Sequence, residues 1–288
     1  MELIEISYRD ATTNKISVFR ASNPNNIICI CLPAMGVRAS YYKTFASELA
    51  LSGHTVITAD WRGQGYSSQP ASFKTDFGYE HYVTDLDDIV RFCQQKFTNK
   101  KIVLVGHSLG GQIQSLYASR FPQNCNGLVL IASNSVYYKG WGKKLARKIK
   151  IAGTFFYPLS RLLGFFPGHI IGFGGREARM VMKDWTYNLK TGSYKLTNST
   201  FDYDNALKEA QPNILCISFD NDHLIAPKQA VINLLNKFSD AANKEHLHFK
   251  ADQIGIPNLN HFSWAKQPTP IVRLINDWIK KNELVDTR

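Results

Sequence analysis

The chain has 288 residues, of which 44% are apolar, 12% aromatic and 20% charged, and its net charge is +11. This composition permits a large buried core and excludes a disordered or low-complexity chain, and the length fits one α/β core with an insertion. No uninterrupted run of 18 apolar residues occurs, so we expect no transmembrane helix.

In chain order, the sequence alternates between patterns typical of strands and of helices. Residues 2–20 alternate well enough in polarity to predict an antiparallel edge pair, with a turn near Thr13 and Asn14. Later apolar runs of strand length lie at 26–34, 54–60, 101–106, 127–133, 213–219 and 245–251. Helical patterns lie at 41–52, 79–97, 112–120, 229–237 and 269–280. Since the inner runs are apolar on both faces, we predict a mostly parallel, doubly wound sheet with helices on both faces.

The alternation breaks between residues 135 and 205, where no further parallel strand is predicted. We call residues 135–205 the inserted segment and predict that it is a basic, aromatic-rich and mainly helical cap. Residues 1–134 and 206–288 then form the two halves of a single α/β core.

The inserted segment carries most of the positive charge. Residues 135–200 contain twelve lysines and arginines but only two acidic residues, Glu177 and Asp184, together with twelve aromatic residues. Within them, 143–163 has apolar residues every three or four positions, which is typical of an amphipathic helix. Pro158 is expected to kink or end that helix.

A glycine-rich turn between a predicted strand and a helix carries the strongest chemical signal. The run 101–106 leads directly into GHSLGG (residues 106–111), and a helical pattern follows. In such a G-x-S-x-G turn the serine has a strained backbone and needs small neighbours, which Gly106 and Gly110 supply. The helix N-terminus stabilises an oxyanion that develops beside the serine. We therefore predict that Ser108 is a covalent nucleophile; the alternative is a turn with an inactive serine.

A serine hydroxyl needs an adjacent base that is itself oriented by an acid. In this arrangement the acid follows a late strand, and the loop after residues 213–219 contains two candidates, Asp220 and Asp222. We favour Asp222, because it lies farther into the loop and its side chain can lean across the carboxyl edge of the sheet. The alternative is that both aspartates only form a turn and cap the next helix.

The general base is predicted from its position after the last strand. His261 follows that strand and a connecting loop. By contrast, His246 and His248 lie within the strand, and His223 and His107 neighbour the proposed acid and nucleophile. We therefore predict His261 as the base, with a loop histidine stacked on an aromatic ring as the alternative.

The oxyanion is expected to be bound by two backbone amides. One belongs to Leu109, the first residue after the nucleophile. The other is expected in the loop after the first inner strand, where Gly36 lets the chain bend back toward Ser108. Met35 is the best candidate there; the alternative is a simple turn that ends the strand.

The cysteines and the first residues favour a cytoplasmic protein. MELIEISYRD has neither the basic leader nor the apolar stretch of a secretory signal. The five cysteines are odd in number, and Cys29, Cys31 and Cys216 lie in apolar runs, which argues against a disulfide framework. No CxxC or HExxH spacing occurs, so we expect no metal.

Taken together, these segments resemble the α/β-hydrolase superfamily from about residue 26 to the C-terminus. Residues 60–67, DWRGQGYS, match the D-x-R-G-x-G-x-S turn of that superfamily, whose role is structural. Within it, the chain looks most like the capped, monoacylglycerol-lipase-like and serine-aminopeptidase-like branch. It also resembles a bacterial group of predicted hydrolases that share three features, found here as PAMG (33–36), FPG (166–168) and Trp185.

The resemblance implies a triad of Ser108, Asp222 and His261, an acyl-enzyme intermediate and no cofactor. One residue departs from the pattern of many relatives, since Met35 stands where they carry the second residue of a His-Gly pair. The departure leaves the mechanism intact but weakens any inference to a particular lipase.

We predict a carboxylic-ester hydrolase for a fairly apolar acyl group, with a small-molecule ester or thioester as its substrate. The enzyme alternatives are a thioesterase or acyltransferase, a short-peptide peptidase, and a cofactor-free lyase or perhydrolase. The non-enzyme alternative is a catalytically silent protein that binds a ligand or a lipid surface.

Three interpretations of the basic inserted segment remain open: a lid with solvated lysines, a surface that contacts anionic lipid, and a region that attracts an acidic substrate. Nucleic-acid binding is not expected, because no recognised motif accompanies the charge. The oligomeric state is not predicted by the sequence.

Overall fold

The computed structural model describes residues 1–98 and 100–285. Its main sheet contains β1 (Glu2–Ser7), β2 (Thr13–Phe19), β3 (Ile27–Leu32), β4 (Thr55–Ala59), β5 (Lys101–His107), β6 (Gly127–Ile131), β9 (Ile214–Phe219) and β10 (Lys244–Phe249). The strand order is β1-β2-β4-β3-β5-β6-β9-β10. Neighbours from β4 to β10 are parallel, whereas β2 runs antiparallel to both β1 and β4. The predicted mostly parallel sheet with an antiparallel edge pair is confirmed.

The turn of the edge pair lies a few residues earlier than predicted. The chain reverses between Tyr8 and Thr12, where the Tyr8 amide donates to the Thr12 carbonyl at 2.8 Å. Thr13 and Asn14 are already the first residues of β2. The buried side chain of Asn14 donates to the Asp60 carbonyl at 2.8 Å, so a tertiary contact holds it in the strand.

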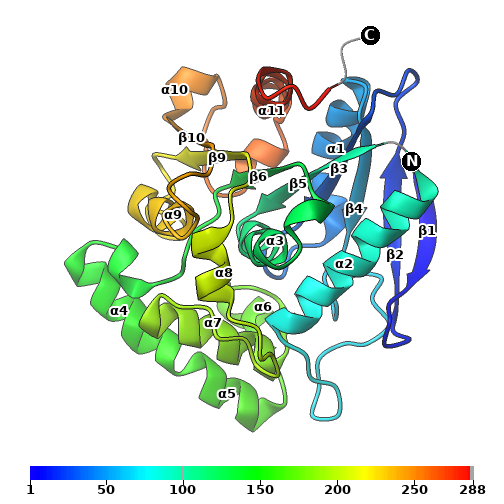
Figure 1. Cartoon of the computed structure of the whole chain (residues 1–288). Helices are drawn as coiled ribbons and strands as arrows, with labels where there is room; N and C mark the ends of the chain where they lie inside the picture. Colours follow the sequence, from blue (N-terminus) through cyan, green and yellow to red (C-terminus); the bar gives the residue numbers. More distant parts are fainter. Residues whose placement is uncertain (99, 286–288) are drawn as a thin grey trace.

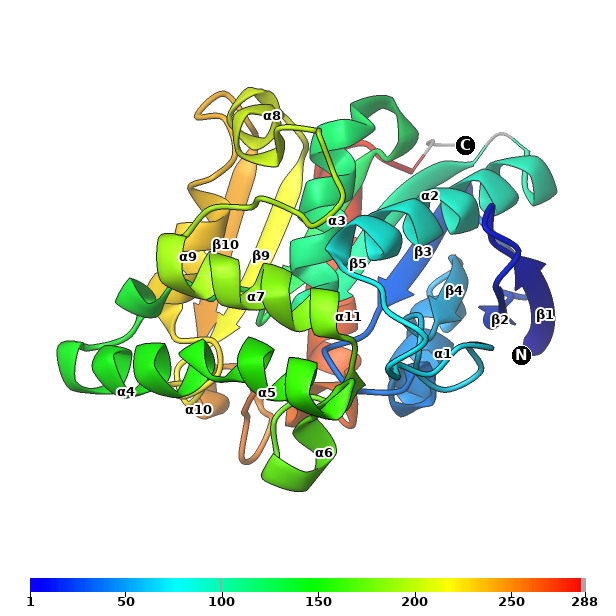
Figure 2. The ribbon, with the colours of Figure 1, turned by 90° about the horizontal axis from the view of Figure 1, so that it is seen from below.

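Helices cover both faces of this sheet (Figures 1 and 2). The helices of the described chain are α1 (Lys43–Leu51), α2 (Tyr79–Lys96), α3 (Leu109–Arg120), α4 (Lys143–Thr154), α5 (Phe156–Leu163), α6 (Gly168–Ile171), α7 (Arg179–Thr191), α8 (Tyr203–Glu209), α9 (Lys228–Leu235), α10 (Ala251–Ile254) and α11 (Thr269–Lys281). In Figure 2, α2 and α3 lie in front of the sheet, and α1 and α11 lie behind it. The five helices predicted for the core correspond to α1, α2, α3, α9 and α11.

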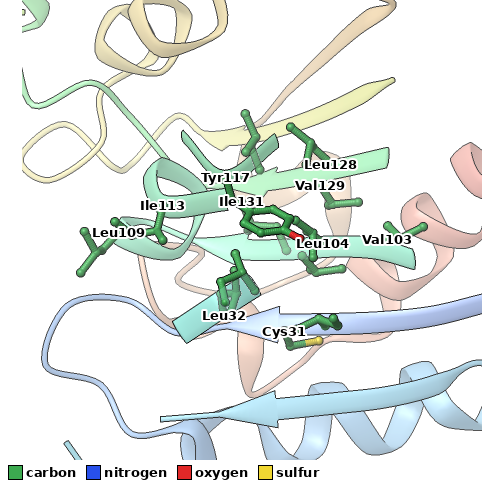
Figure 3. Close-up of a cluster of buried hydrophobic side chains, with 14 of the residues drawn as sticks. Cys31, Leu32, Val103, Leu104, Leu109, Ile113, Tyr117, Leu128, Val129 and Ile131 are labelled. Carbon is green, nitrogen blue, oxygen red and sulfur yellow. The ribbon is translucent and has the colours of Figure 1, made fainter. Parts of the chain in front are cut away.

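Helix α3 is the central element of the core. Ile113 and Tyr117 project from it toward the apolar side chains of β3, β5 and β6 (Figure 3). Its other side is covered by α2 and α8, so that 11 of its 12 residues are buried. Because α3 begins directly after Ser108, this packing holds the residue in a fixed position at the carboxyl edge of β5.

The inserted segment connects β6 to β9 and forms one end of the molecule, away from β1 and β2 (Figure 1). It contains α4, α5, α6 and α7, and a short antiparallel pair, β7 (Phe166–Pro167) and β8 (Arg176–Glu177). Helix α8 straddles the boundary predicted at residues 205 and 206, and it packs against α3.

The amphipathic pattern over 143–163 forms two helices, and the break lies at Phe155, not at the predicted Pro158. Pro158 is the third residue of α5. Proline is tolerated in the first turn of a helix, where the backbone N–H has no intrahelical acceptor. Because Pro158 fits only in the first turn, a new helix has to start shortly before this residue. Within the described residues, no helix is long and apolar enough to cross a membrane.

Candidate active site

Ser108 stands in a strained turn between β5 and α3. Its backbone has φ 54° and ψ −113°, a conformation that only a tightly constrained non-glycine residue keeps. The turn leaves no room for side chains beside it. A Cβ at Gly106 would lie 2.4 Å from the Gly110 carbonyl carbon, and one at Gly110 would lie 2.3 Å from the Leu32 carbonyl oxygen. The two glycines singled out in the sequence are thus needed for the backbone to pass.

His261 and Asp222 meet in a buried pair. His261 Nδ1 lies 2.6 Å from Asp222 Oδ2, and both side chains are less than 5% exposed. The other carboxylate oxygen of Asp222 accepts a hydrogen bond from the Ala226 amide at 3.1 Å. Since the carboxylate accepts a hydrogen bond from the Nδ1–H group, Nε2 of His261 is left as the unprotonated, basic nitrogen.

Asp220, the competing acid, faces elsewhere. Its side chain is 45% exposed, and Oδ1 lies 3.5 Å from Nε2 of His248. Both aspartates follow β9 in the same loop, and only the fold of that loop distinguishes them. The geometry brings Asp222 to His261 and leaves Asp220 outside the pair.

Ser108 follows His107 in the chain, and His107 lies beside the His261–Asp222 pair. The rings of His107 and His261 have centroids 4.7 Å apart. No hydrogen bond joins the Ser108 hydroxyl to His261 in the described part of the chain. Such contacts are often long before substrate binds and tighten during the reaction.

His107 is a neutral structural support. Burial, and then the charge of nearby His261, lowers its pKa well below the ordinary value. Its Nδ1 accepts a hydrogen bond of 2.6 Å from the Tyr42 hydroxyl, which itself accepts one from the Ala34 amide at 3.0 Å. The Trp264 ring packs edge-on against His107, and its indole N–H donates to the His261 carbonyl at 3.1 Å.

These contacts connect three loops that are distant in the sequence: the loop after β3, the nucleophile turn and the histidine loop. Neither Tyr42 nor Trp264 was predicted as part of the site. No sequence motif marks them, since each is an aromatic residue in an otherwise ordinary apolar pattern.

The loop after β3 presents the predicted oxyanion residue Met35 to the same cavity as Ser108 and Leu109. Among the described residues, neither the Met35 amide nor the Leu109 amide donates a hydrogen bond, so both donors are available. Gly36 has φ 70°, and a Cβ there would lie 2.1 Å from the Gly175 amide nitrogen. The loop is therefore clamped against the inserted segment.

The DWRGQGYS turn braces that loop from the side. Asp60 accepts hydrogen bonds from the amides of Ala39 at 2.7 Å and of Tyr66 at 3.1 Å. The indole of Trp61 donates to the Pro33 carbonyl at 2.8 Å. Arg62 forms a buried ion pair with Asp85. Each contact holds backbone in place, as expected for a structural turn.

An apolar cavity of about 370 Å³ extends from Ser108 into the inserted segment. Its walls come from α4, α5 and α7 and include Ile149, Phe156, Trp185 and Leu189. Its polar lining is limited to a few groups, among them Gln112 and Asn134. In the described residues, no group of three or more His, Cys, Asp or Glu side chains is arranged to hold a metal ion.

The fold and the position of the site define the class of protein. A sequence profile described as "alpha/beta hydrolase fold" matches residues 27–252, which is most of the chain. The chain therefore belongs to the α/β-hydrolase fold family.

Individual relatives are similar over shorter stretches or at lower identity. Lysophospholipase L2 of Escherichia coli (strain K12) is 32% identical over 120 residues, which cover 40% of this chain and 34% of that protein. The monoacylglycerol lipase of Paleococcus ferrophilus has a similar structure, with a TM-score of 0.63 and 16% sequence identity. The match covers 98% of this chain and 100% of that protein's chain. DcsB, solved with a substrate analogue, has a TM-score of 0.67 at 15% identity, with 98% of each chain covered. These structural likenesses concern the fold.

Proposed function

We propose that this protein is a serine hydrolase that cleaves carboxylic esters with an apolar acyl group. The observation that carries the proposal is the buried hydrogen bond of 2.6 Å between His261 and Asp222, next to a strained serine turn. A histidine oriented by a buried carboxylate, together with a serine at a helix N-terminus, is the arrangement that activates a hydroxyl for attack.

In the proposed reaction, Nε2 of His261 takes the proton of the Ser108 hydroxyl as its oxygen attacks the ester carbonyl. The oxyanion accepts hydrogen bonds from the amides of Met35 and Leu109, and Asp222 stabilises the imidazolium. His261 then donates its proton to the alcohol, which leaves an acyl-enzyme. Water attacks this ester with His261 again as base, and the carboxylic acid is released.

The cavity supports an apolar acyl group. Its volume lies at the lower end of the range for small-molecule sites, and two tryptophans and two phenylalanines, Trp141, Trp185, Phe156 and Phe173, help to line it. Few polar groups line the walls, so a charged acyl chain would lose hydration without compensation. The names of two similar proteins, a lysophospholipase and a monoacylglycerol lipase, agree with an ester of this kind.

A fluorophosphonate probe tests the nucleophile, because only an activated serine reacts with it. We expect the wild-type protein and a Ser115→Ala variant to be labelled, since Ser115 lies buried in α3 and only donates to the Gly111 carbonyl. The Ser108→Ala variant should not be labelled and should lose turnover by at least about a thousandfold. Labelling of Ser108→Ala at the wild-type rate would disprove the proposal.

A substrate panel then separates the alternatives. It contains p-nitrophenyl esters of increasing chain length, acyl thioesters and aminoacyl amides. We expect the highest kcat/KM for an ester of medium chain length. A preference for the thioesters or the amides would favour a thioesterase or a peptidase acting through the same serine.

A further inference from the structure

Large apolar side chains lie exposed along the outer side of α4, α5 and α6. Phe155 is 63% exposed, Leu162 74% and Ile170 75%. Ile151, Leu163 and Ile171 are exposed to a lesser degree. Figures 1 and 2 show these three helices together at one end of the molecule. Exposed apolar groups that gather in one region mark a surface that contacts another apolar phase.

Helix α4 adds a row of positive charges to this region. It carries five cations and no acidic residue: Lys143, Lys144, Arg147, Lys148 and Lys150. In the described structure, none of the five takes part in an ion pair. Like charges four residues apart reduce the stability of a helix, so folding alone does not favour this arrangement.

No acidic side chain between residues 135 and 200 balances this charge at the surface. Glu177 is 1% exposed and Asp184 is 3% exposed, so both acids of this stretch are buried. The positive charge of α4 is therefore not opposed by an exposed acid of its own stretch, and it suits an anionic surface.

The charged and the apolar groups share one side of α4. Lys144, Lys148, Ile151 and Phe155 follow each other at intervals of three and four residues, which places them on a single helical face. A helix with lysines beside apolar residues on its exposed side is typical of proteins that lie at the membrane interface.

The cavity opens at the same surface. Ala152, Ile171 and Leu224 line it and are also exposed, with Leu224 at 66%, so they belong to its mouth. Ala152 lies directly beside Ile151 in α4, and Ile171 directly beside Ile170 in α6. The rim of the mouth thus continues into the exposed apolar region.

We propose that α4, α5 and α6 form a docking surface for an anionic phospholipid bilayer. In the docked protein, the mouth of the cavity faces the lipid. Phe155, Leu162 and Ile170 enter the interface, and the cations of α4 contact the headgroups. The docking part stands independently of catalysis. If the protein docks in this way, the acyl chain enters the cavity beside Ser108 directly from the bilayer. This consequence of docking rests on the proposed function.

Co-sedimentation with vesicles tests the docking. We expect binding to phosphatidylcholine vesicles that contain phosphatidylglycerol, weak binding to phosphatidylcholine alone, and loss of binding at high salt. The Lys144→Glu/Lys148→Glu variant should bind at least about 25-fold more weakly, because each lysine near an anionic surface contributes about fivefold. Lys96→Glu/Lys280→Glu, on α2 and α11, makes the same charge change elsewhere and should bind within about twofold of wild type.

A second variant separates a bilayer from a soluble polyanion. Phe155→Ser/Ile170→Ser keeps every charge and should also lose at least about tenfold in vesicle binding. If only the charge variant weakens binding, or if the vesicles without anionic lipid bind equally well, the proposal is wrong. Circular dichroism and thermal unfolding of each variant confirm that it is folded.

Activity measurements test the consequence. Both surface variants should hydrolyse a water-soluble short ester at the wild-type rate but a vesicle-embedded ester at least about tenfold more slowly. Ser108→Ala should bind vesicles as the wild type does. If the wild-type protein is inactive but binds anionic vesicles, the proposed function is refuted and the docking surface stands. If it is active but does not bind vesicles, the docking surface is refuted and the proposed function stands.

Discussion

The core and the inserted segment differ in how their charged side chains are paired and in where their apolar side chains are exposed. In the core, Arg62 is buried against Asp85, and Arg120 forms ion pairs with Glu80. In the inserted segment, the cations of α4 have no acidic partner among the described residues, and Phe155 and Ile170 lie in solvent. Exposed apolar residues also occur in the core, such as Leu51 and Phe73, so the feature particular to the inserted segment is that they lie beside a row of cations without acidic partners among the described residues.

This difference shows which part of the sequence folding explains. Burial and pairing account for the sheet, α3 and the braces around Ser108. They do not account for a row of cations beside exposed apolar residues, which the proposed docking on an anionic bilayer would explain. Four experiments test this difference, in order of decreasing expected effect.

The first concerns the two aspartates of the core loop after β9. Asp222→Asn should lower kcat on a p-nitrophenyl ester by about 10⁴-fold, because an amide no longer holds His261 in the required tautomer. Asp220→Asn is the matched control and should change kcat by less than about threefold, since Asp220 pairs with His248. A large loss in Asp220→Asn with little effect of Asp222→Asn would reverse the assignment of the acid.

The second compares a buried and an exposed arginine of the core. Arg62→Ala leaves the Asp85 carboxylate buried without its partner and should lower the free energy of unfolding by about 3–5 kcal/mol. Arg20→Ala removes a pair with Glu2 in which both side chains are about half exposed, and should cost less than about 1 kcal/mol. Urea unfolding measures both. Equal costs would show that the turn after β4 does not brace the core.

The third experiment concerns the pKa values of two buried carboxylates, one in the core and one in the inserted segment. Burial raises the pKa of Asp85 to about 6 although Arg62 lowers it, and burial raises the pKa of Glu177 to about 7, opposed only by a hydrogen bond from the Gly175 amide. Between pH 4.5 and 7, Glu177 is ionised in the unfolded chain but protonated in the folded one. Its contribution to stability therefore falls as the pH rises through this window.

Glu177→Gln removes this titration. The variant should match the wild type in free energy of unfolding at pH 4 and exceed it by roughly 2–3 kcal/mol at pH 8. Glu5→Gln, at an exposed position of β1, should show no such divergence. A wild-type protein that gains stability relative to Glu177→Gln between pH 5 and 8 would contradict the assigned direction.

The fourth and smallest effect lies inside the cavity that the two regions share. Ala152→Phe adds bulk at the mouth and should lower kcat/KM for long-chain p-nitrophenyl esters by about tenfold while sparing the acetate. Ile151→Phe adds a ring to the adjacent residue, which does not line the cavity, and should leave the chain-length profile unchanged. If the wild type, Ala152→Phe and Ile151→Phe have identical chain-length profiles, the acyl group does not bind at this mouth of the cavity.

The sequence by itself determined much of the core. Apolar runs buried on both faces give parallel strands, and a serine flanked by Gly106 and Gly110 after such a run fixes the position of the turn. These features are local, because steric clearance and burial act within a few residues. The order of Ser108, the aspartate loop and His261 along the chain was predicted from the order that such residues have in this type of fold.

Only the tertiary structure showed that Asp222, and not Asp220, lies against His261, since both follow the same strand and differ only in the direction that the loop gives them. It also revealed how Tyr42, His107 and Trp264 connect three loops, because contacts between distant segments leave no periodic pattern. Likewise, the sequence showed that α4 is basic and amphipathic. That its cations have no acidic partner among the described residues and that Phe155 reaches solvent became visible only when the packing of α4 against the core was known.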